Sequence, residues 1–218
     1  GIYSLCYTIG SVLSIIVNTV SGIWTPWFYD RMNEGQITQI RKKSKLYIGF
    51  ISFLTINAIM LSPEGIMILA PDSYRAAKKL TPVVLIGIYF SLMYLLPSSI
   101  EYFYKKTKYI AIGTVSAAAV NVILNYYCIK KWGYFAAAYT TLLTYFLYFI
   151  FHMIIYKKLE NRQIFSTVSL VVWIVCVLVA ALVAVVFSEA ILIRGSLLII
   201  ADIIFILILK KEFIEKNE

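Results

Sequence analysis

Hydroxyl and amide side chains recur at helical spacing along the first apolar segment of the sequence, residues 2–28. The residues that share one face are Ser4, Thr8, Ser11, Asn18 and Thr25, with Tyr3, Tyr7, Ser14 and Ser21 along its edge. Side chains three or four positions apart lie on the same face of an α-helix. These groups donate and accept neutral hydrogen bonds, which suits water or a substrate rich in hydroxyl groups.

Two interpretations fit a polar face that runs through an apolar helix. Contact seams between membrane helices favour small residues and hydroxyl groups. A wall of a water-filled cavity accepts larger polar side chains as well. We favour the cavity because Asn18 and the tyrosines Tyr3 and Tyr7 are large for a seam.

A second polar face contains two amides four residues apart, Asn121 and Asn125, in line with Thr114 and Ala118. The amides can bond to each other, to a neighbouring backbone or to a substrate hydroxyl. A polar clamp between helices and a substrate contact are both open interpretations, and we favour the clamp.

Charged residues within the apolar segments are few. Asp202 has no opposite charge within one helical turn. We therefore expect that it has a polar partner on another helix or that its carboxyl is protonated. Asp202 is the candidate ion or proton site. We expect Glu101 to pair with Lys105 and Arg194 to extend towards the interface. His152 has no acid or cysteine near it in the sequence, so no metal site is expected.

The sequence that must position these residues is a series of seven apolar segments. A membrane-spanning helix needs about 20 mostly apolar residues. The candidate spans are residues 2–28, 46–62, 80–104, 109–129, 133–156, 165–188 and 191–209. They predict an all-α, polytopic membrane helix bundle with seven transmembrane helices.

Prolines and polar gaps predict where these helices end or bend. Pro63 is expected to interrupt the second helix and Pro97 to kink the third, because proline has no N–H to donate. The first helix is expected to end near Pro26, and residues 36–45 to form a short helix at the membrane interface.

Most of the 20 Lys and Arg residues lie in alternate gaps, at 29–45, 105–108, 157–164 and after 209. Basic loops stay on the cytoplasmic side, so we expect a cytoplasmic C-terminus and Gly1 on the outer side. That start and the odd number of spans predict further membrane helices before Gly1. The net charge of +9 therefore reflects topology, and no nucleic-acid partner is expected.

The order of several short motifs resembles that of a known transporter family. The motifs are Gly1-Ile-Tyr-Ser, Thr25-Pro26, Asn33-Glu34-Gly35, Asp72-Ser-Tyr74-Arg-Ala-Ala77, Lys105-Lys-Thr107-Lys, Asn121-Val-Ile-Leu-Asn125 and Gly133-Tyr-Phe-Ala136-Ala-Ala-Tyr-Thr140. Together they resemble the C-terminal half of a Wzx-type polysaccharide or lipid-linked-oligosaccharide flippase, of the multidrug/oligosaccharidyl-lipid/polysaccharide flippase superfamily. The family prefers glycine where this chain has Ala136.

The resemblance implies one lobe of a two-lobed bundle that works by alternating access in the bacterial cytoplasmic membrane. Residues 1–158 would be a transport lobe of five helices, and residues 159–218 a two-helix hairpin and a cytoplasmic tail. The implied partners are a lipid-linked oligosaccharide substrate, membrane lipids and an N-terminal half of the same protein. No enzymatic activity or cofactor is expected, and no GxxxxGK[ST] nucleotide loop occurs.

Three other functions are alternatives to a flippase. A drug or cation antiporter of the same superfamily needs an embedded carboxylate, for which Asp202 is the candidate. A membrane glycosyltransferase or polysaccharide polymerase needs acids, Arg or His in a large loop outside the membrane, and the outer gaps are short and poor in acids. A scaffold would not need the polar face of residues 2–28.

Overall fold

The computed structural model describes residues 1–214 as a bundle of α-helices with no strand. The elements are α1 (Ile2–Asn33), α2 (Ile37–Leu69), the short 3₁₀ helix η1 (Asp72–Tyr74), α3 (Ala77–Met93), α4 (Leu95–Phe103), α5 (Lys108–Trp132), α6 (Ala136–Leu159), α7 (Thr167–Val186) and α8 (Ile191–Ile214). Residues 215–218, which end the predicted cytoplasmic tail, lie outside the described residues.

The all-α membrane fold is confirmed. Six helical segments of the described chain are long and apolar enough to cross a membrane, with α3 and α4 together forming one of them. The helix α8 lies where the seventh span was predicted. The chain is therefore a multi-pass membrane protein.

The helix α3 forms the centre of the bundle. It packs against α1, α2, α6 and α7, and nearly all of its side chains are buried. Glycines allow two of these close approaches. A Cβ atom on Gly10 of α1 would lie 2.0 Å from Cδ1 of Ile88, and a Cβ atom on Gly87 of α3 would lie 3.4 Å from the Cα atom of Leu142 in α6. Small residues of this kind let membrane helices pack closely.

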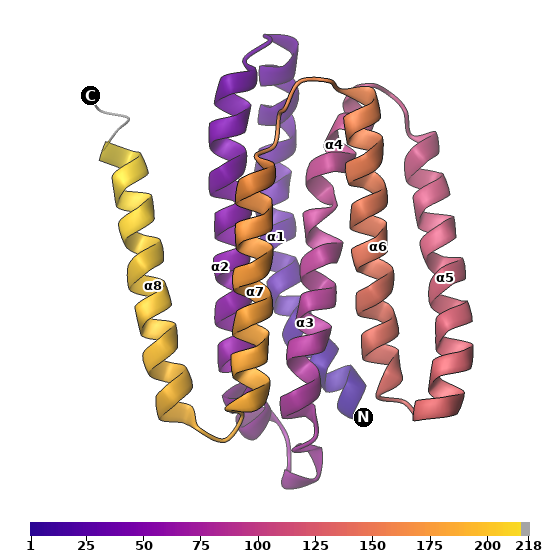
Figure 1. The fold of residues 1–218 in the computed structure, drawn as a ribbon, viewed down its shortest axis with the longest axis vertical. Helices are drawn as coiled ribbons and strands as arrows, with labels where there is room; N and C mark the ends of the chain where they lie inside the picture. Colours follow the sequence, from indigo (N-terminus) through magenta and orange to yellow (C-terminus); the bar gives the residue numbers. More distant parts are fainter. Residues whose placement is uncertain (215–218) are drawn as a thin grey trace.

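The outer helices have fewer neighbours. Figure 1 shows α8 at one edge of the bundle and α5 at the other, with α2, α7, α3 and α6 between them and α1 behind. The helix α5 packs mainly against α6, and α8 mainly against α2. Most side chains of α5 are consequently exposed.

The connections with most of the basic residues lie at one end of the bundle. The α1–α2, α4–α5 and α6–α7 connections are at the top of Figure 1, and the α2–α3, α5–α6 and α7–α8 connections are at the opposite end. This arrangement gives the bundle a basic end and an end with fewer cations.

The expected interruption at Pro63 was wrong, because α2 continues through it to Leu69. Pro63 has no N–H for the carbonyl of Ile59, one turn earlier. The hydroxyl of Ser62 donates to this carbonyl instead, at 2.8 Å. The helix therefore keeps its hydrogen bonding across the proline.

Other helix limits also differ from the prediction. The helix α1 continues through Pro26 to Asn33, and residues 37–45 are the first turns of α2 rather than a separate interfacial helix. Gly35, with φ of +71°, reverses the chain between these two helices. Near Pro97, where a kink was expected, the helix is interrupted: α3 ends at Met93, whose carbonyl would otherwise accept from residue 97, and α4 begins at Leu95.

Candidate functional site

The polar face of α1 is open in the structure. Ser4, Thr8, Ser11 and Asn18 are exposed, and Thr25 is half-buried. The hydroxyl groups of Thr8, Ser11 and Thr25 donate to backbone carbonyls of the preceding turn, at 3.1, 2.7 and 2.9 Å. Their lone pairs remain free to accept hydrogen bonds. No other helix of residues 1–214 covers this face, so the cavity interpretation stays a prediction.

The edge of this face joins α1 to α6. The hydroxyl of Tyr3 lies 3.3 Å from that of Tyr7 and 3.3 Å from Oγ1 of Thr141. The rings of the two tyrosines are in contact, with centroids 4.9 Å apart. Both tyrosines are half-buried, and the contact of Tyr3 with Thr141 ties the N-terminal end of α1 to α6.

The amides of α5 bind to threonines of α6. Asn121 donates from Nδ2 to Oγ1 of Thr141 at 3.4 Å and of Thr144 at 3.3 Å. Asn125 donates to Oδ1 of Asn121 at 2.9 Å and accepts from the hydroxyl of Thr140. These bonds join α5 to α6, as expected of a polar clamp between helices.

Together these side chains form one polar network across three helices. We call it the α1–α6–α5 network, and its members are Tyr3, Tyr7, Thr140, Thr141, Thr144, Asn121 and Asn125. Thr141 is the junction, since it contacts Tyr3 of α1 and Asn121 of α5. A shift of α6 would therefore change contacts on both sides.

Asp202 has a polar partner on another helix, as expected. Its Oδ1 accepts a hydrogen bond of 3.0 Å from Nδ2 of Asn57 in α2, and the same amide donates to the carbonyl of Phe53 at 3.1 Å. Asp202 and Asn57 are half-buried. The pair joins α8 to α2 near the middle of both helices.

Glu101 does not pair with Lys105, and that expectation was wrong. The helix α4 ends at Phe103, and Lys105 lies in the following turn with φ of +55°, so the helical i+4 geometry is lost. Oε1 of Glu101 instead lies 2.6 Å from Nδ1 of His152 in α6. His152 thus has an acidic neighbour that its sequence surroundings do not reveal.

Arg194 does not extend towards the interface, which corrects a second expectation. It is 2% exposed and pairs with the carboxylate of Glu64 in α2. It also donates to the carbonyl oxygens of Met60 and Phe187, each at 3.0 Å. These acceptors from α2 and from the end of α7 satisfy the guanidinium within the protein.

Two further ion pairs lie at the ends of the helices. Glu160, after α6, accepts from Arg162 and from the hydroxyl of Tyr104, both at 2.7 Å. The hydrogen bonds from Arg162 lower the pKa of Glu160 to about 2. Lys78, beside Glu189 at 2.9 Å, lowers the pKa of that exposed carboxyl. No spacing in the sequence points to the Lys78–Glu189 pair.

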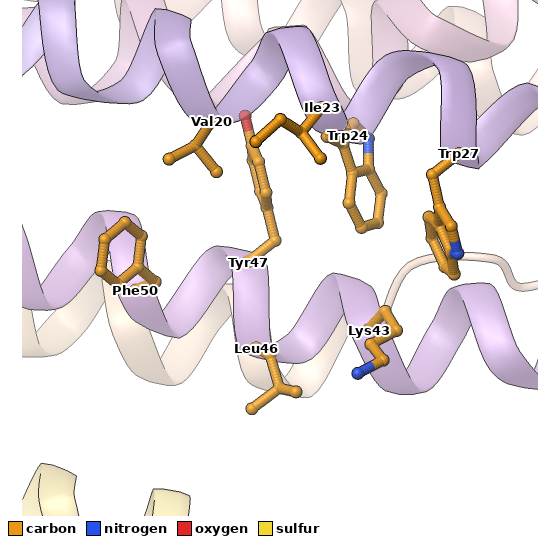
Figure 2. A pocket seen from close by; sticks show the side chains of 8 residues that line it. All are labelled: Val20, Ile23, Trp24, Trp27, Lys43, Leu46, Tyr47 and Phe50. Atoms are coloured by element: carbon orange, nitrogen blue, oxygen red, sulfur yellow. The ribbon is translucent and has the colours of Figure 1, made fainter.

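A groove of about 430 Å³ lies between α1 and α2 (Figure 2). Its lining is almost entirely apolar: Val20, Ile23, Trp24, Trp27, Lys43, Leu46, Tyr47 and Phe50. The hydroxyl of Tyr47 points to α1, where it lies 2.6 Å from that of Ser21. The groove includes no residue of the polar face, so it does not extend the candidate polar path.

A smaller cavity of about 180 Å³ lies between α5 and α6, lined by Gly113, Ser116, Ala117, Val120, Thr144, Leu147, Tyr148 and Phe151. Within residues 1–214, no group of three or more His, Cys, Asp or Glu side chains is arranged to hold a metal ion. Comparisons with models of protein families, with curated proteins and with solved structures give no match.

Proposed function

We propose that this membrane protein is one lobe of a flippase that moves a lipid-linked oligosaccharide by alternating access. The observation that supports this most is the exposed polar face of α1, with Asn18 in the apolar part of the helix. An amide that faces hydrocarbon loses its hydrogen bonds to water at a considerable cost. A water-filled path that accepts sugar hydroxyl groups would satisfy the amide.

The α1–α6–α5 network supports a moving part. Alternating access requires helices to change partners on either side of a central path. Thr141 links α1 and α5 through weak hydrogen bonds of 3.3 and 3.4 Å, which can exchange at low cost. We assign the second wall of the path to the second lobe of the proposed flippase.

The proposed location is the bacterial cytoplasmic membrane. The end of the bundle with the α1–α2, α4–α5 and α6–α7 connections carries most of the cations, and basic loops stay in the cytoplasm. This orientation puts Gly1 outside and the end of α8 inside. The diphosphate of the carrier lipid would then meet the basic end first.

The substitution Asn18→Leu in the full-length protein tests the proposal. We expect transport of a polyprenyl-diphosphate oligosaccharide in proteoliposomes to fall about three- to tenfold, because the substitution removes one hydrogen bond to the substrate. Asn33→Leu is the matched control, because Asn33 is exposed at the end of the same helix, outside the apolar segment. Unchanged transport by a well-folded Asn18→Leu protein would mean that the polar face does not contact the substrate.

A drug or cation antiporter is the second candidate, favoured by the embedded carboxyl of Asp202 and its bond to Asn57. The same proteoliposomes distinguish the two functions. A flippase with Asp202→Asn should keep most of its oligosaccharide transport. An antiporter with this change should lose ion-driven drug efflux.

A further inference from the structure

Glu101 and His152 form a carboxylate–imidazole pair that is completely buried. Glu101 lies near the end of α4 and His152 in the last third of α6, and both are 0% exposed. The distance of 2.6 Å between Oε1 and Nδ1 is that of a strong, charge-assisted hydrogen bond. Ionisable groups inside membrane proteins are rare, and they mark ion pathways and proton relays.

The outer atoms of the pair have no partner. Oε2 of Glu101 and Nε2 of His152 are buried and make no hydrogen bond within the described part of the chain. The Glu160–Arg162 pair is different, since both oxygens of Glu160 accept hydrogen bonds. Buried polar atoms are nearly always paired, so the two free atoms of the inner pair indicate a role beyond holding helices together.

The surroundings of the imidazole are aromatic and uncharged. The rings of Tyr94 and Tyr148 lie against His152, with centroids 5.4 and 4.5 Å away. These tyrosines, with Tyr102 and Tyr145 near Tyr94, are the titratable neighbours from α6 and from the α3–α4 segment. From α5 the neighbour is Gly113, which has no charge. Glu101 is thus the group that can balance a charge on His152.

The glycine leaves room at the free nitrogen. A Cβ atom on Gly113 would lie 3.0 Å from Nε2 of His152 and 2.9 Å from Cε1 of Phe151. Any larger residue would press on the nitrogen. The helix α5 therefore touches the imidazole at the one atom that is free to change its protonation.

We infer that Glu101 and His152 form a proton-binding site inside the bundle. In the unloaded state the Nδ1–H group of the neutral imidazole donates a hydrogen bond to the carboxylate, and the pair has a net charge of −1. A proton from the aqueous phase then forms the Nε2–H bond, and the resulting imidazolium and carboxylate have no net charge. A net charge is costly in a low-dielectric interior, and binding of the proton removes it.

Proton uptake acts at the interface of α5 with α6, where the α1–α6–α5 network also lies. If the proposed function holds, the proton bound here is the ion that couples to transport. Proton binding itself does not depend on the nature of the cargo.

The single histidine of the chain allows a direct test. The protein is labelled with ¹⁵N-histidine, placed in lipid nanodiscs and followed by NMR between about pH 5 and 8, where imidazole usually titrates. We expect Nδ1 to stay protonated and Nε2 to gain a proton as the pH falls. An imidazole that keeps one protonation state over this range would overturn the inference.

A pair of variants isolates the role of the carboxylate. Glu101→Gln should lower the midpoint of the histidine titration by about one pH unit or more, because it removes the opposite charge. Glu34→Gln, which removes an exposed carboxylate that pairs with Arg31, should leave the midpoint unchanged. Equal midpoints in the wild type and in Glu101→Gln would also contradict the site.

Gly113→Ala gives a second readout if Glu101→Gln does not fold. The added methyl group should shift the ¹⁵Nε2 signal and lower the proton affinity of His152, while a Gly22→Ala control, at a glycine with open space, should do neither. A Gly113→Ala protein with the wild-type titration would contradict the site. A titration that depends on Glu101 in a protein without oligosaccharide transport would uphold the site and refute the proposed cargo.

Discussion

Among single residues, the buried acids Glu160 and Glu101 differ in how completely their carboxylate oxygens are hydrogen-bonded. Glu160 accepts from Arg162 and Tyr104 on both carboxylate oxygens, whereas Glu101 has one bonded and one free oxygen. The first arrangement is that of a structural anchor. The second leaves a position at which protonation can change.

The anchoring role of Glu160 predicts a dependence of stability on pH. Its pKa is lowered from an ordinary 4.5 to about 2, so its ionised form is favoured by folding. The stabilisation is complete above pH 4.5 and is lost as the pH falls towards about 2. In detergent, the unfolding temperature of Glu160→Gln should therefore lie below that of the wild type above pH 4.5. This difference should narrow as the pH falls towards about 2.

The exposed acid Glu34 supplies the comparison for that experiment. Its pair with Arg31 is on the surface, and surface pairs contribute little. Glu34→Gln should unfold close to the wild-type temperature at each pH. If the difference in unfolding temperature between Glu160→Gln and the wild type does not change with pH, the carboxylate does not act through its charge.

Residue partners were predictable from the sequence only where local spacing decides them. The lack of a charge near Asp202 correctly indicated a polar partner on another helix, here Asn57. The partner of Glu101 lies 51 residues away and that of Arg194 lies 130 residues away, so neither could be read from neighbours along the chain. Helix packing selects such partners, and packing is not encoded in periodicity alone.

Among the helices, α2 shows how a membrane helix can tolerate proline. Freed carbonyls in a bilayer must find another donor. The carbonyl of Ile59 finds it in the hydroxyl of Ser62, next to Pro63. The serine and the proline therefore act as a unit, although the proline alone predicts a break.

Ser62→Ala should lower the stability of the protein by about 1 kcal/mol, because it leaves a buried carbonyl without a donor. Ser91→Ala is the matched control. Ser91 also donates to a carbonyl three residues earlier, that of Ile88, but no proline follows it there. Thermal unfolding should show a clear loss for the first variant and a small one for the second. An equal loss in both would mean that Ser62 does not compensate for Pro63.

The existence and order of the helices follow from segment length and hydropathy, and their ends do not. Residues 37–45 are polar enough to look like an interfacial helix, but α2 runs through them with Ile40 fully buried. Tertiary packing thus extends the helix beyond its apolar part. The polar face of residues 2–28 was also predictable, since it depends only on spacing along one helix.

At the scale of the whole molecule, the bundle has an open polar side on α1 and a basic end. The separation of basic from other connections was predictable from the alternation of Lys and Arg along the chain. The sequence does not show what covers the polar side, and the described helices leave it exposed. The central claim of the proposed function is that water and sugar, rather than lipid, meet this side.

Cysteine accessibility in the full-length protein tests that claim most directly. Cys6, Cys128 and Cys176 are first replaced, and single cysteines are introduced at Ser11 and at its neighbour Val12, which is exposed but apolar. In proteoliposomes, a water-soluble maleimide should modify Ser11→Cys rapidly and Val12→Cys slowly, and the lipid-linked oligosaccharide should protect Ser11→Cys. Equal modification of both positions, or none at Ser11→Cys, would contradict a water-filled path along α1.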